Sequence, residues 1–195
     1  EVQWTQPEHK DFESFARRLD KEFERLDYCG VNACRNFYEV NQAGAWNKSQ
    51  QTYEVTLNTF CPDADIYYAV NDSTVNTSSS LYETPIPLDE DATIYSAVYR
   101  SGKPLGKVTR KSFAVNKATG CDYTCNPEAG WEHLNKGFGL TDGRRGYARD
   151  MRRWISFYQD TVQIVVELKK PQKVKEVAFS SLWRPVNEIW PARAM

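Results

Sequence analysis

The chain has 195 residues, with 25 Lys and Arg against 26 Asp and Glu, so its formal net charge is -1. This length allows one large domain or two small ones, each with a buried core. The balanced charge excludes a strongly basic surface, so we expect no nucleic-acid partner. The sequence contains no run of about 18 apolar residues, and we therefore expect no membrane span.

The first segment predicts an amphipathic helix. Its apolar residues recur at spacings of three and four, which places them on one face. Thr5 is the expected N-cap, with Glu8 completing a capping box and Pro7 in the first turn, and Gly30 is the expected left-handed stop. The apolar face consists of Phe12, Phe15, Ala16, Leu19, Phe23 and Leu26. The charged residues between them are expected to form a solvated face.

A period of two replaces the helical period after residues 41–51, which have the composition of a linker. Tyr53, Val55 and Leu57 alternate with polar residues, and polar turns separate this strand from the next ones. Similar alternation recurs at 66–70, 94–99 and 109–115. Short strands at roughly ten-residue spacing predict an antiparallel β-sandwich of immunoglobulin-like type.

The composition changes again at Gly120. We expect irregular, turn-rich structure from there to Gly146, then one strand at 162–168 and another at 174–179. An all-β domain needs more strands than these to close its edges, so we expect the last unit to be incomplete. The first residue, Glu1, is likewise expected to be an internal position of a longer protein.

The five cysteines leave their pairing open. Cys29 and Cys34 are near one another in sequence, Cys121 and Cys125 form a C-x3-C pair, and Cys61 is left over. These spacings and the presence of only two histidines do not favour a zinc site. Local disulfides and free thiols remain alternatives.

Three segments carry a resemblance to known families. The segment 1–35, EVQWTQPEHKDFESFARRLDKEFERLDYCGVNACR, is similar to the end of the catalytic barrel in family-20 glycoside hydrolases, the bacterial β-N-acetylhexosaminidases. The phrase SSSLYETPIPLDEDATIYSAVY resembles the C-terminal sandwich of chitobiases and hexosaminidases. The segment GLTDGRRG, followed by Trp154 and VQIVVELKKPQKVKEVAF, resembles the opening of a discoidin-like (coagulation factor 5/8 type C) jelly roll.

The resemblance implies a mostly β chain of three domains. Residues 1–41 would be the terminal helix and linker of a (β/α)8 catalytic barrel, 42–118 an immunoglobulin-like β-sandwich, and 119–195 an incomplete discoidin-like jelly roll. The implied role is that of a non-catalytic C-terminal accessory region of an exported β-N-acetylhexosaminidase, serving as a spacer and candidate carbohydrate-binding module. The alternative is a purely structural or adhesive β-domain array at a cell surface, and an independent hydrolase ranks last.

We expect no catalytic residue in this chain. Asp89 and Glu90 are the only tempting acidic pair, but they stand in a turn, where carboxylates are solvated and cannot hold a proton near neutral pH. His9 and His133 are not framed by a triad motif. The resemblance places the catalytic acids in an upstream barrel, so the chain should be inactive alone, and the parent would be periplasmic, outer-surface or secreted in a bacterium.

Sugar binding is the functional interpretation with the most support, because sugars offer C–H faces to aromatic rings and hydroxyls to planar polar groups. The candidate carbohydrate-binding residues are Trp183, Arg184, Trp190 and Tyr147, with glycans bearing N-acetylhexosamine as the expected partners. Asp142, in the LTDG turn, is the candidate ligand of a structural calcium ion, although a turn-forming role is the favoured alternative. No other cofactor is expected. A homodimer through the apolar helix face is a further expectation.

Overall fold

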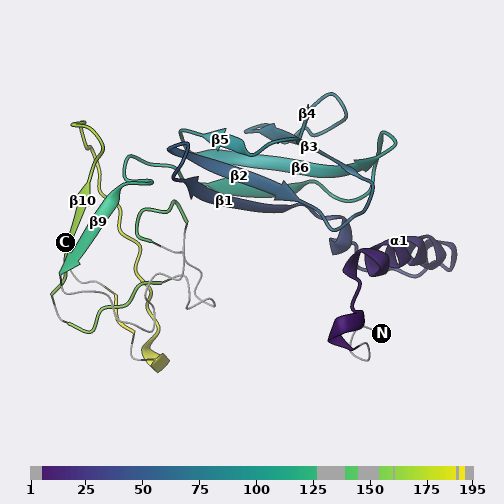
Figure 1. The fold of residues 1–195 in the computed structure, drawn as a ribbon, viewed down its shortest axis with the longest axis horizontal. Helices are drawn as coiled ribbons and strands as arrows, with labels where there is room; N and C mark the ends of the chain where they lie inside the picture. The colour runs from purple at the N-terminus through teal and green to yellow at the C-terminus, as the bar shows by residue number, and fades with distance from the viewer. Residues whose placement is uncertain (1–5, 127–138, 145–153, 160, 188, 192–195) are drawn as a thin grey trace. The chain divides into compact units, whose positions relative to one another are not determined.

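The computed structural model describes residues 6–126, 139–144, 154–159, 161–187 and 189–191. Its described part is mostly β, with one N-terminal α-helix (Figure 1). The chain divides into two compact units, one made of residues 1–43, 55–86 and 92–112 and the other of 44–54, 87–91 and 113–195. The predicted mostly β class is confirmed.

Helix α1 spans Phe12–Tyr28 and begins later than its sequence predicts. Its N-cap is Asp11, whose Oδ1 accepts a hydrogen bond of 3.0 Å from the Ser14 amide. The expected cap, Thr5, lies outside the described residues, and the short 3-10 helix η1 (Pro7–His9) takes the place of the expected first turn. The cap prediction is wrong because an extended Asp11 supplies a carboxylate to the free helix amides, which a capping residue needs to do.

The end of α1 follows the prediction. Gly30 has a φ of +67°, the left-handed conformation that glycine adopts without steric cost. The Val31 amide donates to the Leu26 carbonyl at 2.8 Å and the Gly30 amide to the Asp27 carbonyl at 3.0 Å. These two bonds close the helix as a Schellman motif.

The apolar face of α1 is partly covered by its own unit. Ala16 and Phe23 are buried, and the Phe23 ring packs on Tyr38 of the 3-10 helix η2 (Asn36–Tyr38), with 5.3 Å between ring centroids. Phe12 stays 57% exposed, although its ring meets the edge of Phe60 at 5.3 Å. The homodimer through this face stays a prediction.

Among the described helices, none has the length and apolar character needed to cross a membrane.

A three-stranded sheet has the order β1-β2-β5. Its strands are β1 (Asn41–Asn47), β2 (Thr52–Asn58) and β5 (Ile86–Leu88). The alternation predicted for Tyr53, Val55 and Leu57 is confirmed, since all three are buried.

The linker expected at 41–51 is wrong, because β1 occupies most of it. The inward positions of β1 are Gln42 and Gly44. Neither is a large apolar residue, so the alternation of buried and exposed positions cannot be recognised from apolar residues alone. Gly44 is required by close packing, since a Cβ there would lie 2.3 Å from the Tyr53 hydroxyl. The strand therefore depends on its neighbours and not on its own composition.

The second sheet has the order β4-β3-β6-β7, and β8 also pairs with β6. Its strands are β3 (Asp65–Val70), β4 (Ser80–Leu81), β6 (Ala92–Arg100), β7 (Lys103–Pro104) and β8 (Thr109–Phe113). Strand β3 is antiparallel to β6, with Ile66 opposite Val98. Val55, Ile94 and Val98 are 0% exposed, so side chains fill the interior between the sheets.

A buried polar contact joins the two sheets within the first unit. The Gln42 amide nitrogen donates to the Ser96 hydroxyl at 2.7 Å and to the Thr109 carbonyl at 3.2 Å. Gln42 and Ser96 are both buried, so this bond replaces the water that each group would otherwise need. The fold is an antiparallel β-sandwich, as the strand spacing predicts.

The free edge of β1 is blocked by cationic side chains. The Lys111 ammonium donates to the Gln42 carbonyl at 2.6 Å, and Arg144 Nε donates to the Gly44 carbonyl at 2.9 Å. Charged groups on an edge strand prevent another chain from adding to the sheet.

The later part of the chain forms a two-stranded antiparallel sheet from β9 (Asp122–Asn126) and β10 (Gln163–Glu167). The strand predicted at 162–168 is confirmed by β10. Two other expectations are wrong: residues 122–126 are a strand and not irregular, and 174–179 are irregular and not a strand. Val177 is 69% exposed, and the stretch 174–179 is assigned to no strand in spite of its apolar alternation. The discoidin-like assignment stays a prediction.

Candidate functional site

A small hairpin in the later part of the chain carries three of the four predicted sugar-binding residues, Trp183, Arg184 and Trp190. Arg184 and Ile189 form an antiparallel bridge, exchanging backbone hydrogen bonds of 3.0 and 3.2 Å. The 3-10 helix η5 (Pro185–Asn187) connects them. Trp183 and Trp190 flank the bridge and are 68% and 63% exposed.

Trp183 directly precedes and Trp190 directly follows the two bridged residues, Arg184 and Ile189. Sequence reasoning chose both tryptophans from the loop composition of this stretch.

The other predicted sugar-binding residues are placed differently. Arg184 is half-buried and forms the bridge itself. Tyr147 lies outside the described residues. The structure thus places three of the four candidates at this hairpin.

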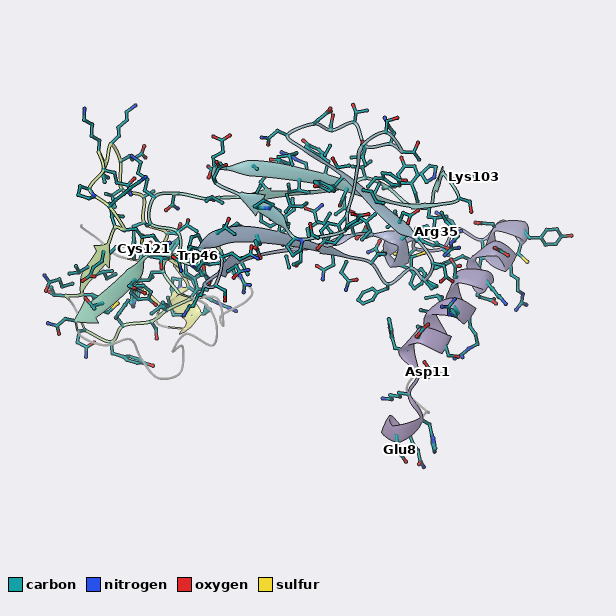
Figure 2. All side chains as sticks on the ribbon, turned by 45° about the horizontal axis from the view of Figure 1, so that its top comes forward. Glu8, Asp11, Arg35, Trp46, Lys103 and Cys121 are labelled. Carbon is teal, nitrogen blue, oxygen red and sulfur yellow. The ribbon has the colours of Figure 1, made fainter. Side chains whose placement is uncertain are left out.

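A third tryptophan of the second unit, Trp46, is already covered. The Lys169 ammonium lies 3.8 Å from the centroid of its ring. Gly120, with a φ of +72°, packs so closely that a Cβ would lie 2.1 Å from the indole. Figure 2 shows Trp46 beside Cys121, the residue after this glycine. Trp46 therefore has a packing role.

Asp142 uses both carboxylate oxygens to hold its own turn. Oδ2 accepts a hydrogen bond of 3.1 Å from the Gly139 amide, and Oδ1 accepts one of 2.9 Å from the Arg144 amide. Gly143 follows with a φ of +73°. Within the ranges that the structure describes, no three His, Cys, Asp or Glu side chains gather as metal ligands. The geometry fits the turn-forming alternative, and calcium binding at Asp142 stays a prediction.

Asp89 and Glu90 are both exposed in the turn between β5 and β6, as expected. A general acid needs a desolvated setting to keep its proton near neutral pH. The pair has no such setting.

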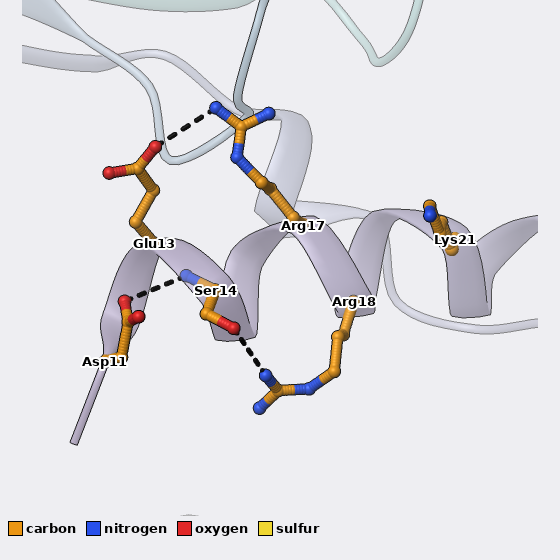
Figure 3. Close-up of a pocket in the computed structure, with 6 residues that line it drawn as sticks. All are labelled: Asp11, Glu13, Ser14, Arg17, Arg18 and Lys21. Atoms are coloured by element: carbon orange, nitrogen blue, oxygen red, sulfur yellow. Dashed lines mark hydrogen bonds and ion pairs between the residues drawn. The ribbon is translucent and has the colours of Figure 1, made fainter. Parts of the chain in front are cut away.

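A depression of about 310 Å³ lies along the first half of α1 (Figure 3). Its lining residues are Asp11, Glu13, Ser14, Arg17, Arg18 and Lys21. The charges are largely paired, since Arg17 binds Glu13 at 3.0 Å and also Asp63, and Arg18 donates to the Ser14 hydroxyl at 2.7 Å. This surface is the solvated helix face that the sequence predicts.

Asp20 is a structurally important position that the sequence analysis missed, because it was counted with the solvated charges of α1. Its side chain is 16% exposed. Asp20 Oδ2 accepts a hydrogen bond of 2.7 Å from Arg100 at the end of β6, and Oδ1 accepts one of 2.9 Å from the Tyr38 hydroxyl. We call these three residues the helix latch, because they tie α1 to the sandwich within the first unit.

The helix latch also changes the acidity of nearby groups. Burial, followed by the hydrogen bond to Asp20, raises the pKa of Tyr38 well above its usual range. Arg100 also donates to the Pro62 carbonyl at 2.7 Å and to the Cys61 sulfur at 3.1 Å. Burial raises the pKa of the Cys61 thiol in spite of this cation. All five cysteines are free thiols in the structure.

These features define a packed antiparallel β-sandwich, with an exposed aromatic hairpin further along the chain. Residues 41–110 match the family model described as the chitobiase/beta-hexosaminidase C-terminal domain. The match begins at the first residue of β1 and ends within β8. It supports the predicted hexosaminidase-type C-terminal region, while the barrel helix and the discoidin-like domain stay predictions. Comparison with curated proteins finds no match.

Proposed function

We propose that this chain is a non-catalytic accessory region of a β-N-acetylhexosaminidase, with the sandwich as a spacer and the hairpin at Arg184–Ile189 as a carbohydrate-binding element. The match of residues 41–110 to the C-terminal domain of chitobiases and hexosaminidases carries this proposal. On this proposal a catalytic barrel accompanies the chain in its parent protein. The parent acts on glycans with terminal N-acetylhexosamine in the periplasm, at the outer surface or outside the cell.

The sandwich suits a spacer because its interior is filled. Val55, Ile94 and Val98 are fully buried, and the Gln42 amide nitrogen is held by the Ser96 hydroxyl across the two sheets. A packed interior resists deformation and holds its two ends at a fixed separation. The exposed tryptophans offer large apolar faces with hydrogen-bonding edges, which suits sugar recognition.

Binding to a panel of immobilised glycans tests the proposal. We expect retention on glycans that end in β-linked N-acetylglucosamine or N-acetylgalactosamine, and none on matched glycans that end in glucose or galactose. Retention on none of them would refute carbohydrate binding and favour the alternative of a structural or adhesive array.

Hydrolysis of an aryl N-acetylglucosaminide tests the non-catalytic assignment separately. We expect no turnover by the purified chain, because its exposed Asp89 and Glu90 lack the desolvated environment of a general acid. Turnover that scales with the concentration of this chain would overturn the assignment.

A further inference from the structure

We propose that Asn76 is the acceptor of an N-linked glycan. Asn76, Thr77 and Ser78 form an Asn-x-Ser sequon, the pattern that oligosaccharyl transferases recognise in exported chains. Two more Asn-x-Ser sequons begin at Asn47 and Asn71, and the structure separates Asn76 from both. The inference goes beyond the proposed function and shares with it only the expected export.

The sequon of Asn76 lies in residues 71–79, which connect β3 to β4 (Figure 1). The Ser79 amide donates to the Asn76 carbonyl at 3.0 Å, which closes a four-residue turn. The Ser78 amide donates to Asn76 Oδ1 at 2.8 Å, so the side chain forms an Asx-turn with the serine of its own sequon. This bend holds the acceptor amide beside the serine that the transferase also has to recognise.

The neighbouring residue anchors this turn and leaves Asn76 at the surface. Val75 is buried, and its carbonyl accepts a hydrogen bond of 2.9 Å from the Tyr99 hydroxyl. Asn76 is exposed, and its Nδ2 donates to no residue that the structure describes. A sugar on this nitrogen therefore replaces no native contact.

The other two sequons are less suitable in the folded chain. Asn47, at the end of β1, is half-buried, and its Nδ2 donates to Glu54 Oε2 at 2.9 Å. A sugar on that nitrogen would compete with Glu54 for the same space. Asn71 is exposed, but its Oδ1 accepts a hydrogen bond of 2.8 Å from the Thr93 amide, so its side chain is held by β6 and not by its own sequon. Only the sequon of Asn76 combines an exposed, free amide nitrogen with the Asx-turn.

The modification is a group transfer from a lipid-linked oligosaccharide pyrophosphate. Asn76 Nδ2 forms a bond to C1 of the first sugar, and the C1–O bond to the pyrophosphate breaks. The lipid pyrophosphate leaves with the electron pair, and the amide proton passes to a base of the transferase. The chain itself supplies only the accessible amide and the serine beside it.

Secretion of the full chain from a eukaryotic cell, with a supplied signal peptide, tests this acceptor site. We expect the chain to carry one oligosaccharide, seen as an intact mass that falls when peptide-N-glycosidase removes the glycan. Asn76→Gln should abolish this shift, and Ser78→Ala should abolish it with Asn76 intact. Asn47→Gln and Asn71→Gln are the matched controls, and each should keep the shift.

Release of the glycan in heavy-oxygen water gives a readout that does not depend on any variant, because the glycosidase converts the modified Asn to a labelled Asp. We expect the label at position 76. A label confined to position 47 or 71, a shift that survives Asn76→Gln, or a secreted or retained chain without any glycan would overturn the proposal. None of these results bears on sugar binding by the chain, which the panel of immobilised glycans tests separately.

Discussion

Replacing Asp20 with alanine is the most direct test of how α1 is held. The variant removes the carboxylate that accepts from Arg100 at 2.7 Å and from the Tyr38 hydroxyl at 2.9 Å. Asp20 is 16% exposed and the Arg100 side chain 30%, so water can replace these bonds only in part. The helix latch should therefore contribute more than a surface ion pair does.

The expected loss is about 2–4 kcal/mol of unfolding free energy. A hydrogen bond to a charged group contributes about 1.5–3 kcal/mol, and removing one member of a buried pair leaves the other without compensation. Partial exposure of Arg100 places the lower end of the expected cost below the range of about 3–5 kcal/mol for fully buried pairs. For a chain of this size, such a loss lowers the melting temperature by about 5–15 °C.

Urea unfolding followed by circular dichroism measures this loss. Glu24→Ala is the matched control, because Glu24 is an exposed carboxylate on the same helix, and its cost should stay within about 0.5 kcal/mol. The double variant of Asp20 and Arg100 should lose less than the sum of the two single variants, since both single variants remove the same bond. An Asp20→Ala cost no larger than that of Glu24→Ala, or strict additivity with Arg100→Ala, would refute the helix latch.

Three further predictions follow from packing and acidity. Gly44→Ala should cost about 1–3 kcal/mol in urea unfolding, because its Cβ would lie 2.3 Å from the Tyr53 hydroxyl, and an unchanged midpoint would contradict the close contact. At neutral pH the exposed Cys29 should react quickly with a disulfide reagent and the buried Cys61 slowly, because burial raises the pKa of the Cys61 thiol. Mass spectrometry of labelled peptides measures both rates. Equal rates would contradict this prediction. Burial and the hydrogen bond to Asp20 raise the folded-state pKa of Tyr38 above the unfolded value of about 10. The stability that Tyr38 adds should thus be complete below about pH 10 and be lost as the pH rises toward the folded-state pKa, and Tyr38→Phe should abolish this part of the alkaline decline in the urea midpoint.

Much of the fold could be predicted from local patterns. Alternation at Tyr53, Val55 and Leu57 predicted β2, and the stop at Gly30 was predicted from glycine's freedom to adopt positive φ. The strand β1 could not be predicted in this way, because its inward positions are Gln42 and Gly44, whose burial depends on Ser96 and Tyr53 far along the chain. The opposite error arose at 174–179, where an apolar alternation predicted a strand but the structure has none.

The sequence by itself determined the mostly β class, the presence of an amphipathic helix and the choice of Trp183 and Trp190 as candidates, because composition and periodicity act over a few neighbouring residues. Only the tertiary structure decided that Asp20 meets Arg100, 80 residues away, and that Arg184 pairs with Ile189. Such contacts depend on strand register and helix docking. These are set by the sum of many packing interactions and leave no mark in the local pattern.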